Sequence, residues 1–290
     1  MDAAVPRTRT PLGKTTRPLL AEILPRERVF GLLDEASDMP LTWVSGPPGS
    51  GKTTAVASWL DHAPQRSLWY QIDESDADPA TFFYYLGLAV ADLESEERPT
   101  LPLLTPEYHA GLPAFARRYA QELYARLKPP FAIVFDGYHE VPASSPLHEV
   151  MREALRELPP GGRALVVSRV DPPAQLARLR ANRQLAHVGW DELRLTREET
   201  ASVAAQRRPE LKAEALAALY DKTQGWAAGL VLLLQQARMG VPITDAPDFA
   251  TRQLVFDYLA GEILQKSDAR TQEFLLQTAH LAQMTAALAE

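Results

Sequence analysis

Residues 41–54, LTWVSGPPGSGKTT, decide the fold of this 290-residue chain. The first five are mostly apolar and predict a buried strand, and the apolar spacing after GKTT is typical of a helix. Between strand and helix, Gly46 stands five residues ahead of the pair Gly51–Lys52. This spacing lets successive backbone N–H groups surround a phosphate at a helix N-terminus. We therefore predict a phosphate-binding loop in a strand–loop–helix setting.

The loop predicts a role for each of its residues. Lys52 is expected to reach the β- and γ-phosphates, and the Thr53 hydroxyl is expected to coordinate Mg²⁺. The cofactors that we predict are ATP or ADP together with Mg²⁺. The loop residues expected to bind nucleotide are Gly46, Pro47, Pro48, Gly49, Ser50, Gly51, Lys52, Thr53 and Thr54.

The same tetrapeptide, G-K-T-T, also occurs at residues 13–16. There the position that matches Gly46 is Thr8, no strand precedes the motif, and Pro18 follows it. We expect this copy not to bind phosphate. Residues 1–21 contain three prolines and no periodic apolar pattern, so we predict a flexible N-terminal tail.

The rest of the chain alternates between strand and helix patterns. Apolar runs at residues 67–73, 131–137 and 164–170 predict three further strands, and helical spacing separates them. This alternation predicts an α/β fold with a parallel sheet flanked by helices, as in P-loop NTPases, over residues 22–194. From residue 195 the pattern is helical and begins with a Thr-x-x-Glu capping box, Thr196 and Glu199.

Three further residues are candidates for catalysis beside Lys52. Asp136 ends the run FAIVFD and is expected to orient the magnesium ion, although an Asp-Gly pair can also simply turn a chain. Glu140, with His139 beside it, is the nearest candidate to orient a water molecule; the alternative is a solvated turn residue. Arg169 ends the run VVSR at the carboxyl edge of the sheet, where it could contact the γ-phosphate or pair with a surface carboxylate.

Composition excludes several classes of protein. The net charge is −7 and no long basic run occurs, which argues against direct DNA binding by this chain. The absence of cysteine excludes disulfides and thiolate metal sites. The most apolar stretch, GWAAGLVLLL, is about half of what a bilayer requires, and the first residues lack the apolar core of a signal peptide. We expect a cytoplasmic protein that does not bind membranes.

The segments LPRERV, WVSGPPGSGKTT, FAIVFDGYHEV, ALVVSRVDPP and GWAAGLVLL occur in an order that resembles a known family. The chain looks like the nucleotide-binding module of the STAND signal-transduction ATPases, in particular the MalT-like, LuxR-type regulators of bacteria. The resemblance runs from about Ile23 to the last residue. It implies a P-loop domain, a helical lid over residues 195–241 and a winged-helix domain that would be truncated at residues 242–290.

The resemblance also implies roles for residues and partners. Arg26 matches an arginine near the adenine and ribose, Asp136 the magnesium acid, Arg169 a sensor arginine, and residues 225–230 the segment that packs over the nucleotide. Relatives close over ADP, open with ATP and an inducer or regulatory protein, and then self-associate. Their inducer-binding and DNA-binding regions have no counterpart here, so we expect an excised portion of a larger protein.

Many relatives carry a second acid where this chain has Gly137. This departure leaves the rate of hydrolysis open, with Glu140 as a possible substitute. The leading hypothesis is an ATP/ADP-operated switch with slow ATP hydrolysis. The alternatives are a nucleotide-binding module without hydrolysis and a P-loop small-molecule kinase, for which the segment LARLRAN would supply arginines.

Overall fold

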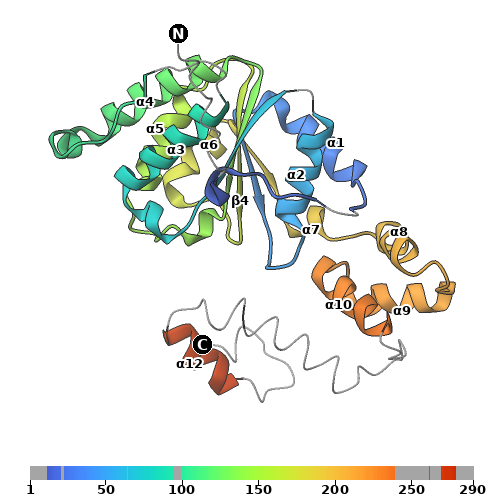
Figure 1. Cartoon of the computed structure of the whole chain (residues 1–290). Coiled ribbons are helices and arrows are strands. Elements are labelled where there is room, and N and C mark those ends of the chain that lie inside the picture. Colours follow the sequence, from blue (N-terminus) through green and yellow to red (C-terminus); the bar gives the residue numbers. More distant parts are fainter. Residues whose placement is uncertain are drawn as a thin grey trace, which may run out of the picture. The chain divides into compact units, whose positions relative to one another are not determined.

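The computed structural model describes residues 12–20, 23–63, 65–93, 99–238, 261 and 269–278 (Figure 1). The chain divides into two compact units. Unit 1 comprises Met1–Pro47 and Gly51–Leu193, and unit 2 comprises Pro48–Ser50 and Arg194–Glu290.

Unit 1 is built on a five-stranded parallel sheet in the order β2-β3-β4-β1-β5. Its strands are β1 (Leu41–Ser45), β2 (Arg66–Gln71), β3 (Phe131–Asp136), β4 (Gly162–Ser168) and β5 (Leu185–Val188). Every residue of β1 and β3 is buried, as expected for central strands of a parallel sheet that is covered on both faces. All carboxyl ends of the strands therefore meet at one edge of the sheet.

Helices cover both faces of this sheet (Figure 1). One face packs against α3 (Pro79–Leu93), α4 (Leu112–Leu127) and α5 (Leu147–Arg156), whose apolar side chains share a core with Trp43 and Phe131. The other face packs against α1 (Glu27–Glu35) and α2 (Lys52–His62), in a second core around Val44 and Val134. Two short helices, α6 (Ala177–Ala181) and α7 (Trp190–Leu193), flank β5 in the sequence. The predicted α/β fold with a parallel sheet is confirmed.

Unit 2 contains α8 (Arg197–Arg207), α9 (Ala213–Thr223), α10 (Ala227–Arg238) and α12 (Ala269–Thr278). Its described core is small and apolar, comprising Leu195, Ala204, Leu219, Leu230 and Leu234. The capping box is confirmed: the Thr196 hydroxyl accepts from Glu199 N at 3.1 Å, and the Glu199 carboxylate accepts from Thr196 N at 2.9 Å. The predicted winged-helix segment, residues 242–290, lies outside the described residues except for residue 261 and α12.

The first G-K-T-T has a defined place in unit 1. Gly13–Thr15 form a 3₁₀ turn, and Lys14 Nζ lies 2.6 Å from Asp73 Oδ2 and 2.7 Å from Asp76 Oδ2. Only 12% of the Lys14 side chain is exposed, while Asp76 is fully buried. Part of the segment that we expected to be flexible is thus held to the loop after β2, because a lysine lies between two carboxylates.

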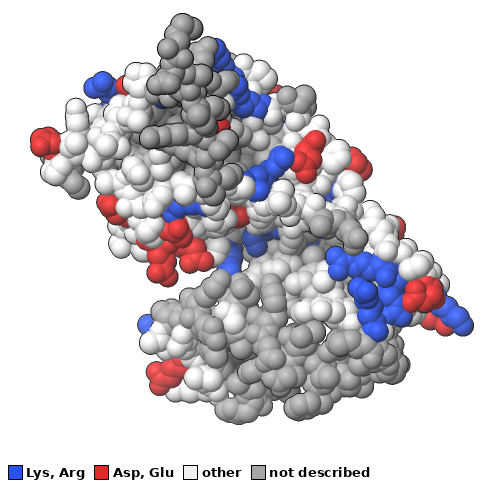
Figure 2. Space-filling view, viewed as in Figure 1, with Lys and Arg blue, Asp and Glu red and all other residues white. Residues whose placement is uncertain are grey.

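The surface of the molecule carries charges of both signs. On the face that Figure 2 shows, basic and acidic side chains of unit 1 are interspersed. Among the helices that the structure describes, none is long and apolar enough to cross a membrane.

Candidate functional site

The second G-K-T-T lies where β1 passes into α2, at the carboxyl edge of the sheet. Gly49 and Gly51 have φ angles of 70° and 82°, in the left-handed region that glycine adopts without the strain that a Cβ causes. Ser50 between them is fully buried. The chain therefore turns sharply here and enters α2 at Lys52, as the strand–loop–helix prediction requires.

Lys52 is the central cation of this loop. It is 8% exposed, and its Nζ donates to the carbonyl oxygens of Gly46 at 2.7 Å and Pro47 at 2.9 Å. Burial lowers the pKa of Lys52 to about 8; the positive charge of Arg169 acts in the same direction and the carboxylate of Asp136 opposes it. The predicted sensor arginine and the loop lysine thus lie close enough to influence each other. A polyanion bound between two such cations would relieve their repulsion.

Thr53 and Asp136 meet beside the lysine. Thr53 Oγ1 donates to Asp136 Oδ2 at 3.0 Å and lies 3.2 Å from Oδ1. Burial raises the pKa of Asp136, while hydrogen bonds from Thr53 and the Gly137 N–H and the charge of Lys52 act against this rise. A hydroxyl and a carboxylate are oxygen ligands of the kind that Mg²⁺ takes together with substrate phosphates. The two residues predicted to hold Mg²⁺ therefore fit that ion.

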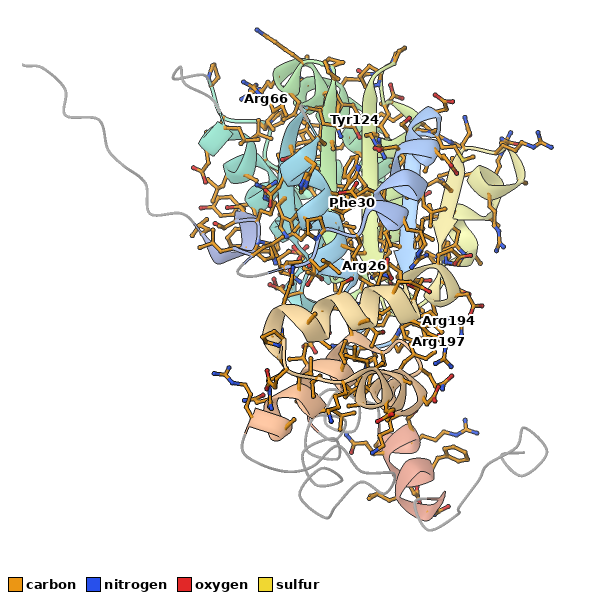
Figure 3. All side chains as sticks on the ribbon, turned by 90° about the vertical axis from the view of Figure 1, so that its right-hand side faces the viewer. Arg26, Phe30, Arg66, Tyr124, Arg194 and Arg197 are labelled. Atoms are coloured by element: carbon orange, nitrogen blue, oxygen red, sulfur yellow. The ribbon has the colours of Figure 1, made fainter. Side chains whose placement is uncertain are left out.

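Arg26 is also brought to this edge of unit 1. It is the N-cap residue of α1 and only 8% exposed. Figure 3 shows Arg26 at the opposite end of unit 1 from Arg66, which begins β2. Because β2 begins at the amino edge of the sheet, Arg26 lies at the carboxyl edge with the loop.

Glu140 lies in a turn beside His139, directly after Gly137 and Tyr138. It ends a 3₁₀ turn, Tyr138–Glu140, and its Oε1 lies 3.2 Å from Nε2 of His139. Among the described contacts, none joins Glu140 to Thr53 or Asp136. Its role in orienting water stays a prediction.

The structure explains why the position after Asp136 carries no second acid. Gly137 has a φ of 85°, and a Cβ there would lie 2.6 Å from Gln71 Nε2 and 2.7 Å from the Ile72 carbonyl oxygen. Such distances are far too short for a side chain. The departure from the family pattern is therefore enforced by the loop after β2.

Sequence reasoning missed several polar residues at the same edge. Gln71 is the last residue of β2 and pairs in register with Asp136. Ser45 Oγ, directly before the loop, lies 3.0 Å from Asp171 Oδ1 and 2.7 Å from His187 Nε2. The signal available in the sequence was their position at strand ends, but β5, which carries His187, was not predicted.

The tip of the loop makes its own contacts within unit 2. Trp226 Nε1 donates to the Pro48 carbonyl at 2.9 Å, and Ala228 N donates to the Gly49 carbonyl at 2.9 Å. Trp226 and Ala228 belong to the segment 225–230, which the resemblance matched to the segment that packs over the nucleotide. This segment includes the first residues of α10. Its contact with a nucleotide stays a prediction.

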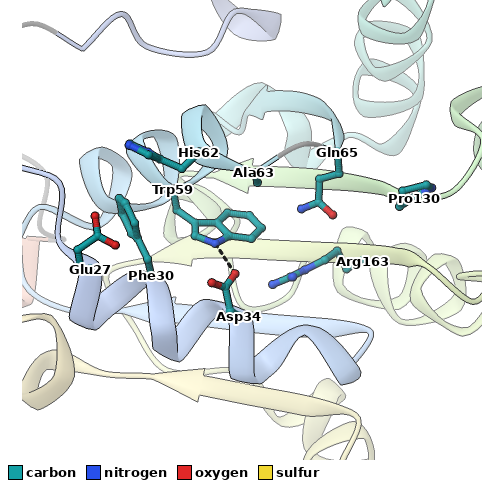
Figure 4. Close-up of a pocket in the computed structure, with 9 residues that line it drawn as sticks. All are labelled: Glu27, Phe30, Asp34, Trp59, His62, Ala63, Gln65, Pro130 and Arg163. Atoms are coloured by element: carbon teal, nitrogen blue, oxygen red, sulfur yellow. Dashed lines mark hydrogen bonds between the residues drawn. The ribbon is translucent and has the colours of Figure 1, made fainter.

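A separate cavity of about 550 Å³ lies between α1 and α2 (Figure 4). Arg163, at the start of β4, stacks 4.6 Å from the Trp59 ring, and its Nη2 donates to the Leu33 carbonyl. Trp59 Nε1 donates to Asp34 at 2.8 Å. These contacts join α1, α2 and the amino edge of the sheet, at the other end of the strands from the loop.

Comparison with known proteins shows the family to which the chain belongs. The family model described as nephrocystin 3, N-terminal, matches residues 21–169, which is 149 of the 290 residues. The HTH-type transcriptional regulators MalT of Cronobacter sakazakii and Serratia proteamaculans are 31% and 32% identical over 286 residues, or 95% of this chain. The chain spans 31% of the length of each of these relatives.

Two solved structures share the fold. A STAND protein with a tetratricopeptide repeat sensor from Pyrococcus horikoshii has a TM-score of 0.54 at 19% identity, covering 92% of this chain and 36% of that one. A Walker-type ATPase of Pyrococcus abyssi has a TM-score of 0.57 at 16% identity, covering 89% of this chain and 77% of that one. The chain therefore belongs to the nephrocystin 3 N-terminal family, and its resemblance to the MalT-like STAND ATPases is confirmed.

Proposed function

We propose that this chain is an ATP/ADP-operated switch, the nucleotide-binding part of a transcriptional regulator. The observation that carries the proposal is the convergence of Lys52, Arg169 and the Thr53–Asp136 pair at one edge of unit 1. The relatives named as transcriptional regulators support the regulatory role. By the same analogy we propose self-association in the ATP state, an inducer that acts through regions outside this chain, and a cytoplasmic location.

The switch depends on the charge that distinguishes ATP from ADP. Lys52 binds the phosphate chain and Arg169 responds to the γ-phosphate, so their combined contacts differ between the two nucleotides. Bound Mg²⁺, held by Thr53 and Asp136, supplies positive charge that neutralises the phosphate oxygens. A ligand shifts a conformational equilibrium only by its differential affinity for the two states. Slow turnover is therefore sufficient for this function.

The test is the ratio of the affinities for ADP and a non-hydrolysable ATP analogue. We expect the wild-type ratio to differ from one by at least about tenfold, and Arg169→Gln to bring it close to one. Arg66→Gln removes an exposed arginine at the opposite edge of the sheet and serves as the matched control. Equal wild-type affinities, or the same loss of discrimination in Arg66→Gln, would contradict the switch.

A nucleotide-binding module without hydrolysis is the second candidate, and the exclusion of a side chain at position 137 favours it. Single-turnover cleavage of bound ATP separates the two candidates. If Glu140 orients water, Glu140→Gln slows cleavage by about 10²-fold with little change in ATP affinity. An unchanged rate removes Glu140 from catalysis, and no cleavage over hours in the wild type establishes the second candidate.

A further inference from the structure

An arginine-lined pocket lies at the amino edge of the sheet in unit 1. Its volume is about 300 Å³, and α5, α6 and the residue before β5 surround it. The polar side chains that line it are Arg152, Arg156, Gln175, Arg178, Asn182 and Gln184. Three of these side chains, Gln175, Arg178 and Asn182, belong to the segment 174–182. The proposed switch does not use the arginines of this segment.

The topology separates this pocket from the nucleotide site. The strand β3 ends at Asp136, and α5 then returns the chain to the start of β4, so that Arg156 lies near the amino ends of the strands. Gln184 directly precedes β5 and lies at the same edge. Since the loop with Lys52 follows the carboxyl end of β1, a ligand in the arginine pocket is not the nucleotide held there.

A buried carboxylate binds two of the three pocket arginines, Arg152 and Arg156. Glu153 is only 3% exposed, and its Oε2 accepts from Arg117 Nη1 at 2.7 Å. Its Oε1 accepts from Arg152 Nε and Nη2 at 3.1 and 3.0 Å, and from Arg156 Nη1 at 3.0 Å. Burial acts to raise the pKa of Glu153, but the hydrogen bonds from Arg117 and Arg152 outweigh it, so the pKa is lowered. Glu153 thus gathers the guanidinium groups of Arg117, Arg152 and Arg156 in one cluster.

The cluster keeps an excess of positive charge. Arg117, Arg152, Arg156 and Arg178 supply four positive charges, while Glu153 and the Arg152 partner Glu149 supply two negative ones. Arg178 is exposed and makes no described ion pair. Each guanidinium offers five N–H donors, and the hydrogen bonds above use at most three of them on any one arginine. Charge and donors are thus available to a ligand, in a chain whose net charge is −7.

We propose that this pocket binds a polyvalent oxyanion, namely the phosphate group of a small phosphorylated molecule or pyrophosphate. The planar guanidinium group matches the oxygens of phosphate in pairs, which an ammonium group does not do. The side-chain amides of Gln175, Asn182 and Gln184 supply neutral donors around the anion. This proposal stands apart from the switch, because it uses no residue of the nucleotide site.

The test is equilibrium dialysis with labelled inorganic pyrophosphate while the nucleotide site is saturated with ADP. We expect one saturable pyrophosphate site per chain and a loss of affinity of about tenfold in Arg178→Gln, since one charged hydrogen-bond donor is removed. Arg180→Gln is the matched control, because Arg180 is exposed on the same short helix but does not line the pocket. It should leave the affinity unchanged.

Other outcomes would overturn the proposal. No saturable binding in the presence of ADP shows that the pocket takes no such ligand, and an equal loss in Arg180→Gln shows only diffuse attraction. Loss of the site in Lys52→Ala, measured without ADP, places the pyrophosphate in the nucleotide loop instead. If the chain self-associates through these arginines and shows no pyrophosphate site, the partner of the pocket is a second copy of the chain and not an oxyanion. Circular dichroism of Arg178→Gln confirms that the variant is folded.

Discussion

Two lysines follow glycine in the same tetrapeptide, and their surroundings give them different roles. Lys14 lies between the carboxylates of Asp73 and Asp76, whereas Lys52 donates to the backbone carbonyls of Gly46 and Pro47, and its pKa responds to the charges of both Arg169 and Asp136. The tetrapeptide alone therefore does not predict phosphate binding; the glycine five residues earlier and the preceding strand distinguish the second copy from the first.

The two lysines form a matched pair of variants. Lys52→Ala removes charge-assisted contacts from a preformed loop and should weaken ADP binding by at least about 10²-fold, with the fold retained. Lys14→Ala should leave ADP affinity unchanged, although it removes two ion pairs from the loop after β2. Titration calorimetry measures both. Undiminished ADP affinity in Lys52→Ala would contradict the site.

The lowered pKa of Lys52 predicts a pH dependence of binding. The free protein holds this lysine with a pKa of about 8, and bound phosphates raise that pKa because they favour the charged form. Below pH 8 the lysine is already charged and the affinity for ADP should be constant. Above pH 8 binding takes up a proton, so the affinity should fall by up to about tenfold per pH unit. Calorimetry of ADP binding at pH 8.5, in two buffers of different ionisation enthalpy, measures the number of protons taken up. If binding takes up no proton, Lys52 is not the phosphate-binding group with the lowered pKa.

Gly137 provides a test of the loop after β3. Gly137→Ala forces a side chain into the left-handed region and against the Ile72 carbonyl, so it should lower the free energy of unfolding by about 2 kcal/mol or more. Gly31→Ala is the control, because Gly31 lies in α1 with open space around its Cβ position; it should raise stability by about 0.5–1 kcal/mol. Urea unfolding compares the two. Equal stability of both variants would show that position 137 tolerates a side chain.

At the level of the site, the sequence predicted the residues that a linear motif connects. Gly46 to Thr53 and Asp136 follow from spacing and strand ends, and the structure joins Thr53 to Asp136. The contact between Ser45 and His187 was not predictable, since it joins β1 to a strand that the sequence did not reveal. The arginines around Glu153 were visible as residues, but the buried carboxylate that fixes them appears only after folding.

At the scale of elements, long periodic segments were the predictable ones. Four strands and the helices between them appear close to the predicted positions. The sequence did not predict strand β5, because this edge strand has only four residues and just the first and the last of them are buried. The sequence did not predict helix α1, because its apolar pattern is short and follows a segment with several prolines.

The capping box of α8 predicts the stability of the helical part of unit 2. Thr196→Ala removes the acceptor for Glu199 N and should destabilise this part by about 1 kcal/mol. Ser202→Ala, in the middle of the same helix, is the control; it removes only a bond to the Glu198 carbonyl and should be neutral or slightly stabilising. Hydrogen exchange of the α8 amides measures the stability of this helix in the two variants. Equal protection in the two variants would contradict the role of the cap.

At the scale of the whole molecule, the sequence predicted a nucleotide-binding fold and a separate helical region. The assignment of Pro48–Ser50 to unit 2 was not predictable, because it depends on contacts of Trp226 and Ala228 with the loop tip. Both contacts lie within unit 2, where Trp226 and Ala228 donate to the carbonyls of Pro48 and Gly49.

The most direct test of this account identifies the nucleotide that the protein carries. Protein purified without added nucleotide is denatured, and the released compounds are separated by chromatography, with Lys52→Ala treated in parallel. We predict near-stoichiometric ADP from the wild type and none from Lys52→Ala. A wild-type protein that releases no nucleotide and binds ATP and ADP weakly and equally would contradict the switch.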